Sequence, residues 1–323
     1  MGPGPALAVT GTPERPVVAV VGATATGKSG VAVALALALG AEVVNADASQ
    51  LYRGMDIGTA KLPVAERRGV PHHLLDVLHV TQEASVATYQ RDARAVIAQI
   101  ADRGGMPVLV GGSGLYVRAV LDPLEFPGTD PQVRDRISAT ATEIGPRALH
   151  DRLADVDPAA AAAIPPANVR RVVRALEVIE LTGRRFTASL PSHGYVRPTV
   201  QVGLRADRAL LDQRIERRVD AMFEAGLLEE VRKLDAAGLR QGRTASRALG
   251  YSQVLDHLDG RTTLAQARDS TAAATRAFAR RQEKWFRRDA RIHWVDVDAS
   301  EHVDAEGVAL AARVVGHVRS LVR

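Results

Sequence analysis

Short, continuous apolar runs alternate with longer Ala-rich or amphipathic segments in the first third of the chain. The apolar runs predict buried strands at residues 17–22, 41–45 and 107–111. The segments between them predict helices at residues 28–40 and 88–103. Strands that are apolar throughout and alternate with helices are typical of a parallel sheet covered on both faces. We therefore predict an α/β fold.

The strand pattern disappears in the middle of the chain. Residues 128–197 instead predict short helices, at 130–144, 147–154, 158–164 and 168–182. The earlier pattern then resumes, with strands at 200–204 and 292–297 and helices at 208–225, 227–237 and 270–288. We predict an all-helical domain at 128–197 that is inserted into an α/β core formed by residues 16–127 and 198–323.

Length and composition restrict the class of protein. The 323 residues, 46% of them hydrophobic and 24% charged, are ordinary for a globular chain with two domains. The chain has no cysteine, which excludes disulfides, thiolate metal sites and cysteine nucleophiles. Residues 1–15 are rich in Gly, Pro and Ala and lack the pattern of a signal peptide, so they predict a disordered tail. No apolar run is long enough to span a membrane. We expect a cytoplasmic protein that is a monomer.

The chain is basic, with 42 Lys and Arg against 37 Asp and Glu and a net charge of +5. One interpretation is a polyanionic partner such as a nucleic acid. The other is an Arg-rich proteome, and composition alone leaves both open.

The loop between the first predicted strand and helix matches the phosphate-binding pattern G-x-x-x-x-G-K-[ST], the P-loop. Its residues are Gly22, Ala23, Thr24, Ala25, Thr26, Gly27, Lys28 and Ser29. Glycines let successive backbone N–H groups point inward, and these groups with the helix N-terminus form an anion site. Lys28 adds a positive charge, and the Ser29 hydroxyl is a candidate ligand for Mg²⁺. The predicted core is therefore P-loop NTPase-like.

A P-loop indicates a polyphosphate ligand and does not identify it. The predicted strand at 107–111 is followed by glycine, without the aspartate that NTP hydrolases place there to hold Mg²⁺. No guanine-reading Asn-Lys-x-Asp is present. These absences argue against a motor ATPase or a switch GTPase, and they leave an ATP-binding small-molecule kinase open.

An acid follows the second predicted strand. Asp47 would lie at the carboxyl edge of the sheet, on the same side as the P-loop. There it could hold Mg²⁺ or act as a general base. A helix cap or a plain surface acid is an equally good interpretation of its position.

The sequence around Asp47 resembles the signature of the tRNA dimethylallyltransferases. The resemblance covers roughly residues 16–296, and its ordered blocks are 47–61, 71–76, 110–116, 171–177, 249–251 and 275–287. Three positions depart from the family pattern. Ala48 replaces the usual Ser, Ser113 replaces Thr, and Lys284 stands where Thr or Ser is common.

The resemblance implies transfer of a dimethylallyl group from dimethylallyl diphosphate to N6 of the adenosine on the 3′ side of a tRNA anticodon. It implies Asp47 as the base, a catalytic role for Ser113, and diphosphate held by the P-loop, Mg²⁺, Arg214 and Arg218. Those two arginines are four apart on a predicted helix and can face one side, although a solvated helix face is the alternative.

The resemblance also implies a tRNA-binding set. Its members are Asp47, Ala48, Ser49, Gln50, Ser113, Arg134, Arg170, Arg171, Val172, Val173, Arg174, Arg247, Gly250 and Tyr251. Several arginines of the predicted inserted helices could grip the phosphates of the anticodon loop. His72 and His73 would point to opposite faces of one strand, which favours structural roles over a metal site.

Three other functions stay open. A P-loop kinase would consume ATP without an allylic donor. An adenylate isopentenyltransferase would alkylate free AMP, ADP or ATP. A P-loop RNA-binding regulator would bind RNA without chemistry.

Overall fold

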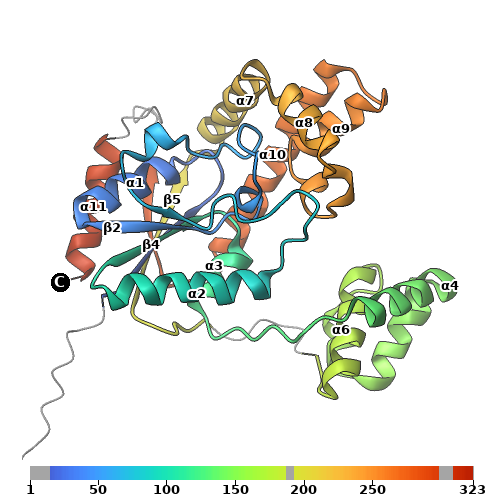
Figure 1. Cartoon of the computed structure of the whole chain (residues 1–323). Coiled ribbons are helices and arrows are strands. Elements are labelled where there is room, and N and C mark those ends of the chain that lie inside the picture. The colour runs from blue at the N-terminus through green and yellow to red at the C-terminus, as the bar shows by residue number, and fades with distance from the viewer. Residues whose placement is uncertain (1–14, 187–192, 298–307, 323) are drawn as a thin grey trace, which may run out of the picture. The chain divides into compact units, whose positions relative to one another are not determined.

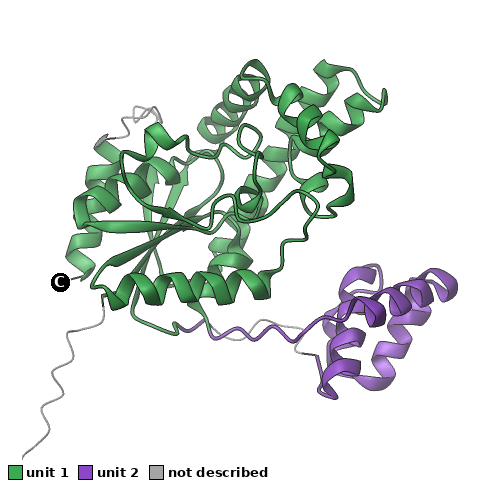
Figure 2. Ribbon diagram, viewed as in Figure 1, with its two compact units in different colours: residues 1–122, 195–323 green, residues 123–194 purple. Residues whose placement is uncertain are grey.

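The computed structural model describes residues 15–186, 193–297 and 308–322. The chain forms two compact units, Met1–Asp122 with Tyr195–Arg323, and Pro123–Gly194 (Figure 2). The first unit is called the core here and the second the helical unit. The predicted tail at 1–15 lies almost entirely outside the described residues. None of the described helices is long and apolar enough to cross a membrane.

The described part of the core contains one six-stranded sheet in which all neighbouring strands are parallel. Its order is β3-β2-β4-β1-β5-β6. The strands are β1 (Val17–Gly22), β2 (Ala41–Asn45), β3 (His72–His73), β4 (Met106–Gly111), β5 (Thr199–Ala206) and β6 (Ile292–Val297). Because β4 lies between β1 and β2, the turn after β4 separates the loops that follow those two strands.

Helices cover both faces of this sheet, as the sequence predicts. Figure 1 shows α1 (Lys28–Leu39) and α11 (Val308–Val322) on one face and α2 (Val86–Asp102) and α3 (Gly114–Leu121) on the other. Side chains of β1 alternate between the two layers. Val18 and Val20 pack with α1 and α11, whereas Val17 and Val21 pack with α2 and α3. This explains why β1 is apolar at every position.

Four more helices complete the core beyond the edge of the sheet. They are α7 (Arg208–Glu224), α8 (Leu227–Ala236), α9 (Tyr251–Leu258) and α10 (Leu264–Phe286). Apolar residues of α7 and α10 pack against two P-loop residues, Ala23 and Ala25. The helices α8 and α9 form a separate cluster with Tyr52 and Met55. These helices therefore support the loops at the carboxyl edge of the sheet.

The helical unit contains α4 (Pro131–Val156), α5 (Pro158–Ala163) and α6 (Val169–Thr182). The predicted break between residues 144 and 147 is a kink inside α4, at Gly145, whose φ is 85° and ψ 163°. The unit begins before the predicted start at residue 128. The guanidinium of Arg174 donates to the carbonyl oxygens of Pro127 and Gly128, which ties this entering segment to α6.

The glycine after β4 is required by close packing. A Cβ at Gly111 would lie 2.2 Å from the backbone oxygen of Ala46, at the end of β2. We expect Gly111→Ala to lower the free energy of unfolding by about 1–3 kcal/mol, the usual range for overpacking. Gly30→Ala is the matched control, because a Cβ there meets no atom within 4 Å. It should raise stability by about 0.4–1 kcal/mol. Urea unfolding measures both, and equal midpoints for the two variants would contradict the packing argument.

Candidate active site

Three turns meet at the carboxyl edge of the sheet. The P-loop follows β1, the turn Gly111–Ser113 follows β4, and Asp47 follows β2. Backbone and side-chain hydrogen bonds join them. Ala46 N–H donates to the Val110 oxygen at 2.7 Å, and Ala48 N–H donates to Ser113 Oγ at 3.3 Å. The predicted base and the predicted phosphate cradle therefore lie on neighbouring parts of one edge.

The backbone of the P-loop has the conformation that an anion cradle needs. Gly22 has a φ of 140°, and a Cβ there would lie 2.5 Å from the Leu204 oxygen. Ala25 has a φ of 64°, and Gly27, the N-cap of α1, has a φ of 88°. The Thr26 hydroxyl and Lys28 Nζ both donate to the Ala23 oxygen, at 2.9 and 2.6 Å. These bonds fix the loop from inside, with Lys28 at its centre.

Arg218 places a second cation beside Lys28. Its Nη1 donates to the Thr24 hydroxyl at 3.4 Å. Burial, with the charge of Arg218, lowers the pKa of the Lys28 ammonium to about 7, although the Asp47 carboxylate opposes the shift. Arg214 lies one turn earlier on α7 and is partly buried. Two adjacent cations in a partly buried loop constitute a site that favours a multiply charged anion.

Asp47 is held by its neighbours in the chain. Its Oδ1 accepts from Ser49 N–H at 2.9 Å, and its backbone is bound on both sides by the Asn45 side chain at 3.0 Å. Burial raises the pKa of the Asp47 carboxyl, against the opposing effects of the Ser49 hydrogen bond and the Lys28 charge. Asp47 and Lys28 thus lie within electrostatic reach of each other, and the carboxyl is a better proton acceptor than an ordinary aspartate.

Gln50 lies one turn beyond Asp47. Its Nε2 donates to the Thr59 oxygen at 3.1 Å, which fixes the orientation of the amide. Thr59 belongs to the segment Gly54–Lys61, the second half of the signature around Asp47. Gln50 therefore depends on the conformation of that segment.

Glu230 of α8 holds the Gly54–Lys61 segment. Its carboxylate accepts from the backbone N–H groups of Asp56, Ile57 and Gly58, at 3.1, 2.8 and 3.2 Å. It also accepts from the Tyr251 hydroxyl at 2.6 Å. A side chain at Gly58 would collide with the Tyr251 ring, because its Cβ would lie 2.5 Å away. Sequence reasoning gave Glu230 no role.

Lys61 fixes the other end of the same segment. Its buried Nζ donates to the Tyr52 oxygen at 2.9 Å and pairs with Asp56 and Asp76 at 2.5 and 2.6 Å. The Gly54–Lys61 segment is thus held at both ends by side chains that support the loop beside Gln50. No signal in the single sequence separates such support from direct chemistry.

The predicted tRNA-binding residues near α9 differ in exposure. Arg247 is exposed, Gly250 is buried, and the Tyr251 side chain is fully buried beneath Gly58. Within this stretch only Arg247 offers a side chain to a ligand, and Tyr251 acts through Glu230.

The helical unit contains the remaining predicted tRNA-binding residues. The carboxylate of Glu177, fully buried, accepts from Arg134 Nη2 and Arg174 Nη1, each at 2.9 Å. Arg170 and Arg171 are exposed on α6. Val172 and Val173 are buried in the core of the unit, so they can contact a ligand only through the backbone. Glu177 thus restrains one arginine of α4, Arg134, and one of α6, Arg174. Two more arginines of α6, Arg170 and Arg171, are exposed.

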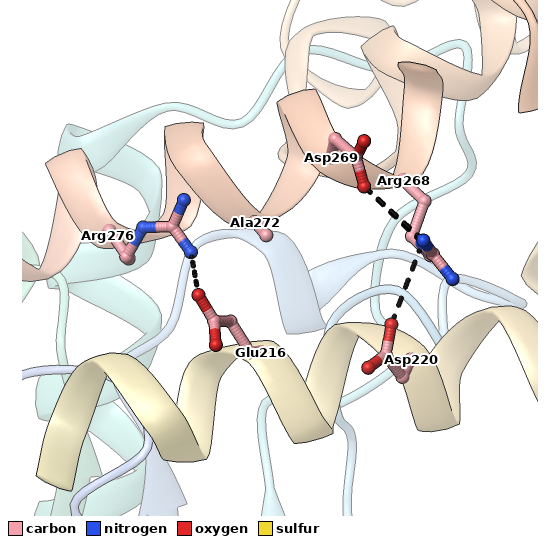
Figure 3. Close-up of a pocket in the computed structure, with 6 residues that line it drawn as sticks. All are labelled: Glu216, Asp220, Arg268, Asp269, Ala272 and Arg276. Atoms are coloured by element: carbon pink, nitrogen blue, oxygen red, sulfur yellow. Dashed lines mark hydrogen bonds and ion pairs between the residues drawn. The ribbon is translucent and has the colours of Figure 1, made fainter. Parts of the chain in front are cut away.

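The cavity between α7 and α10 is separate from these groups. It measures about 250 Å³ and is lined by Glu216, Asp220, Arg268, Asp269, Ala272 and Arg276. Figure 3 shows Arg276 paired with Glu216, and Arg268 between Asp220 and Asp269. Glu216 and Arg218 are two residues apart on α7, about 200° around the helix. The cavity therefore lies on a different flank of α7 from Arg218, and its lining carries three acidic and two basic side chains.

The residues present suit magnesium bound mainly through phosphate. Among the described residues, no group of three or more His, Asp or Glu side chains could hold a metal ion alone. Ser29 is exposed at the first turn of α1, beside the P-loop. Mg²⁺ in phosphate sites uses one or two protein oxygens together with phosphate oxygens and water, which matches this arrangement. The two adjacent histidines have structural partners, since His72 contacts the Val70 oxygen and His73 pairs with Glu42.

Fold and site together define a P-loop protein of the parallel α/β class, with a buried carboxylate at the same edge of the sheet as its P-loop. Comparison with known proteins gives the family. The sequence model of the IPP transferase family matches residues 50–289, and the chain belongs to that family.

Two curated relatives carry the name tRNA dimethylallyltransferase. The one from Kineococcus radiotolerans is 62% identical, over 94% of this chain and 97% of its own length. The one from Thermobifida fusca is 63% identical, over 89% of this chain and 92% of its own length. The crystal structure of the tRNA isopentenylpyrophosphate transferase from Bacillus halodurans is also similar. It is 41% identical with a TM-score of 0.66, and the match covers 95% of this chain and 99% of that one.

Proposed function

We propose that this chain is a tRNA dimethylallyltransferase that moves a dimethylallyl group from dimethylallyl diphosphate to N6 of the adenosine 3′ of the anticodon. Family membership supports the activity. The observation that carries the proposal is the placement of the P-loop, with Lys28, and of Asp47 at the same edge of one parallel sheet, after β1 and β2 on either side of β4. The P-loop with Lys28 can hold the leaving diphosphate while Asp47 takes the proton of the attacking amine.

The donor side stabilises the departing diphosphate. As the bond between C1 and the bridging oxygen breaks, negative charge develops on the diphosphate, and P-loop N–H groups with Lys28 and Arg218 stabilise it. Arg214 extends the same face of α7. Mg²⁺, bound through Ser29 and phosphate oxygens, would supply further charge neutralisation for this leaving group.

The acceptor side removes one proton. The N6 lone pair is delocalised into the adenine ring, so the amine becomes acidic only as its new bond to C1 forms. An ordinary Asp, with a pKa of about 3.9, is too weak a base to deprotonate the amine beforehand. The raised pKa of Asp47 favours proton transfer once N6 carries positive charge. The products are the N6-alkylated adenosine, diphosphate and a protonated Asp47.

The tRNA must present its adenine unstacked. Extruding a base costs a few kcal/mol, least from a single-stranded loop. In the helical unit, Arg134 and Arg174 are restrained by Glu177, and Arg170 and Arg171 are exposed. We propose that these four arginines bind phosphates of the anticodon loop. A cytoplasmic location and a monomeric state stay predictions.

The low pKa of Lys28 predicts pH-dependent binding of the diphosphate. The unliganded ammonium has a pKa of about 7, and a bound anion raises it, so binding above pH 7 takes up a proton. Affinity for dimethylallyl diphosphate should fall about tenfold per pH unit between pH 8 and 9. The terminal phosphate, with a second pKa of about 6, is already ionised in this range.

Titration calorimetry without magnesium measures this dependence. Lys28→Arg is the control, because arginine stays charged and should remove the pH dependence. If affinity for dimethylallyl diphosphate fell equally steeply with pH in the wild-type and Lys28→Arg proteins, Lys28 would not be the group that takes up the proton.

One assay tests the proposed function. The protein is incubated with Mg²⁺, labelled dimethylallyl diphosphate, and either unmodified tRNA or AMP. We expect label on the tRNA alone. Label on AMP alone, as for an adenylate isopentenyltransferase, or on neither acceptor would overturn the assignment.

A further inference from the structure

A buried glutamine joins the two halves of the site. Gln282 of α10 is 6% exposed, and its side-chain amide bonds to backbone on both sides. Its Oε1 accepts from Thr24 N–H of the P-loop at 2.8 Å, and its Nε2 donates to the Gly112 oxygen at 2.9 Å. These bonds span 258 and 170 residues of sequence. A single side chain therefore links the loop after β1 to the turn after β4.

The turn reached by Gln282 continues to the base. Gly112 precedes Ser113, whose Oγ accepts from Ala48 N–H, and Ala48 follows Asp47. Because β4 lies between β1 and β2, this turn is the element between the cradle and the carboxylate. A path of three hydrogen bonds and the peptide link from Gly112 to Ser113 thus runs from Thr24 through Gln282 to Ala48, the residue beside Asp47.

The fit around Gln282 is close. A Cβ at Gly112 would lie 2.3 Å from its Nε2. Trp285, three residues later on the same face of α10, lies equally close to the turn, since a Cβ at Gly114 would be 2.1 Å from its Nε1. The helix α10 therefore supports this turn at two points, and small shifts of the Gln282 amide would be transmitted to it.

Only an amide can make both bonds. Glutamate keeps an acceptor and loses the donor, and methionine, of similar length, loses both. Because Gln282 occupies Thr24 N–H, that group does not face the phosphate, and both polar atoms of the amide are engaged with backbone. Gln282 thus acts through Thr24 and Gly112 rather than on a substrate.

We propose that Gln282 is a positioning residue for prenyl transfer. It holds the P-loop at a fixed distance and orientation from the loop that contains Asp47. This inference rests on the proposed function. A reacting pair displaced by about 1 Å can lose about 10²-fold in rate, whereas binding of each substrate alone depends on one half of the site. Loss of Gln282 should therefore lower kcat more than it raises either KM.

The test compares Gln282→Met with Gln201→Met. Gln201 of β5 is also buried, at 2% exposure, and its Oε1 accepts from the Tyr195 hydroxyl at 3.2 Å. We expect Gln282→Met to lower kcat about 10–100-fold, with each KM within threefold of the wild-type value. Gln201→Met should keep kcat within twofold. If Gln282→Met matches Gln201→Met in kcat, or raises both KM values as much as it lowers kcat, the inference fails.

Gln282→Glu is a second variant that tests the positioning role if Gln282→Met does not fold. It retains the bond from Thr24 N–H and loses the bond to Gly112, so we expect a loss in kcat without a loss of the folded state. A kcat equal to wild type would overturn the inference.

A double-mutant cycle that combines Gln282→Met with Ser113→Ala tests whether Gln282 acts through Gly112 and Ser113. Both residues act through one turn, so the combined loss in kcat should be smaller than the product of the single losses. Fully multiplicative losses would contradict this route.

The wild-type assay distinguishes failure of the proposed function from failure of the positioning role of Gln282. If it transfers no label to tRNA, the proposed function itself fails. If it transfers label and the Gln282 variants do so equally well, only the positioning role fails.

Discussion

Asp47→Asn is expected to lower kcat for tRNA prenylation about 10²–10⁴-fold, the usual contribution of a general base. The amide is isosteric and its oxygen can still accept from Ser49 N–H, so the local backbone should be retained. Pyrophosphate binding should remain within a few-fold of wild type, because the cradle belongs to another loop. Turnover and calorimetric binding, measured side by side, give the two values.

The control for this variant is Asp102→Asn, an identical change at an exposed residue at the end of α2. It should leave kcat unchanged. If Asp47→Asn retained more than a tenth of wild-type turnover, proton removal by Asp47 would be excluded, and solvent or another group would have to accept the N6 proton.

Lys28→Met should lower kcat/KM for dimethylallyl diphosphate about 10²–10³-fold, the cost of removing one preorganised donor from a developing anion. Lys28 lies at the centre of the P-loop beside Arg218, and no other lysine of the described residues belongs to the loop. Unlike Asp47→Asn, this variant should also bind pyrophosphate more weakly. Steady-state kinetics with varied donor, together with calorimetry, distinguishes the two patterns.

Lys233→Met provides the comparison, since Lys233 is exposed on α8. We expect wild-type kinetics from it. If kcat/KM of the Lys28→Met protein for dimethylallyl diphosphate stayed within fivefold of the wild-type value, the leaving diphosphate would not be held by Lys28. The proposed role of the P-loop in the mechanism would then be refuted.

Much of the fold follows from local patterns. β1, β2 and β6 have the predicted bounds. The helices α3, α9 and α11 were not predicted. Of these, α3 and α11 contain two or more valines, whose β-branched side chain disfavours helix. Packing against the sheet outweighs that preference, and tertiary contacts of this kind are invisible in a single sequence.

The site was predictable where a motif specifies backbone geometry. The P-loop follows from its motif between a strand and a helix, whereas Asp47 was singled out by the resemblance of the sequence around it, because its position after a strand suits a helix cap equally well. Gln282 and Glu230 were not predictable as contributors, because each reaches its backbone partners across 170 residues or more. Their chemistry is ordinary for a helix surface, and only the folded chain shows that they bind backbone rather than water.

The chain leaves and re-enters the core at adjacent points. Val196 N–H donates to the Leu121 oxygen at 2.8 Å, immediately outside the boundaries of the helical unit. Backbones joined by such a bond are about 5 Å apart, a gap that two or three residues can close. The 72-residue excursion is thus a detachable module. A shortened gene that joins these two points should still yield a folded core, since the helical unit packs around an apolar cluster of its own.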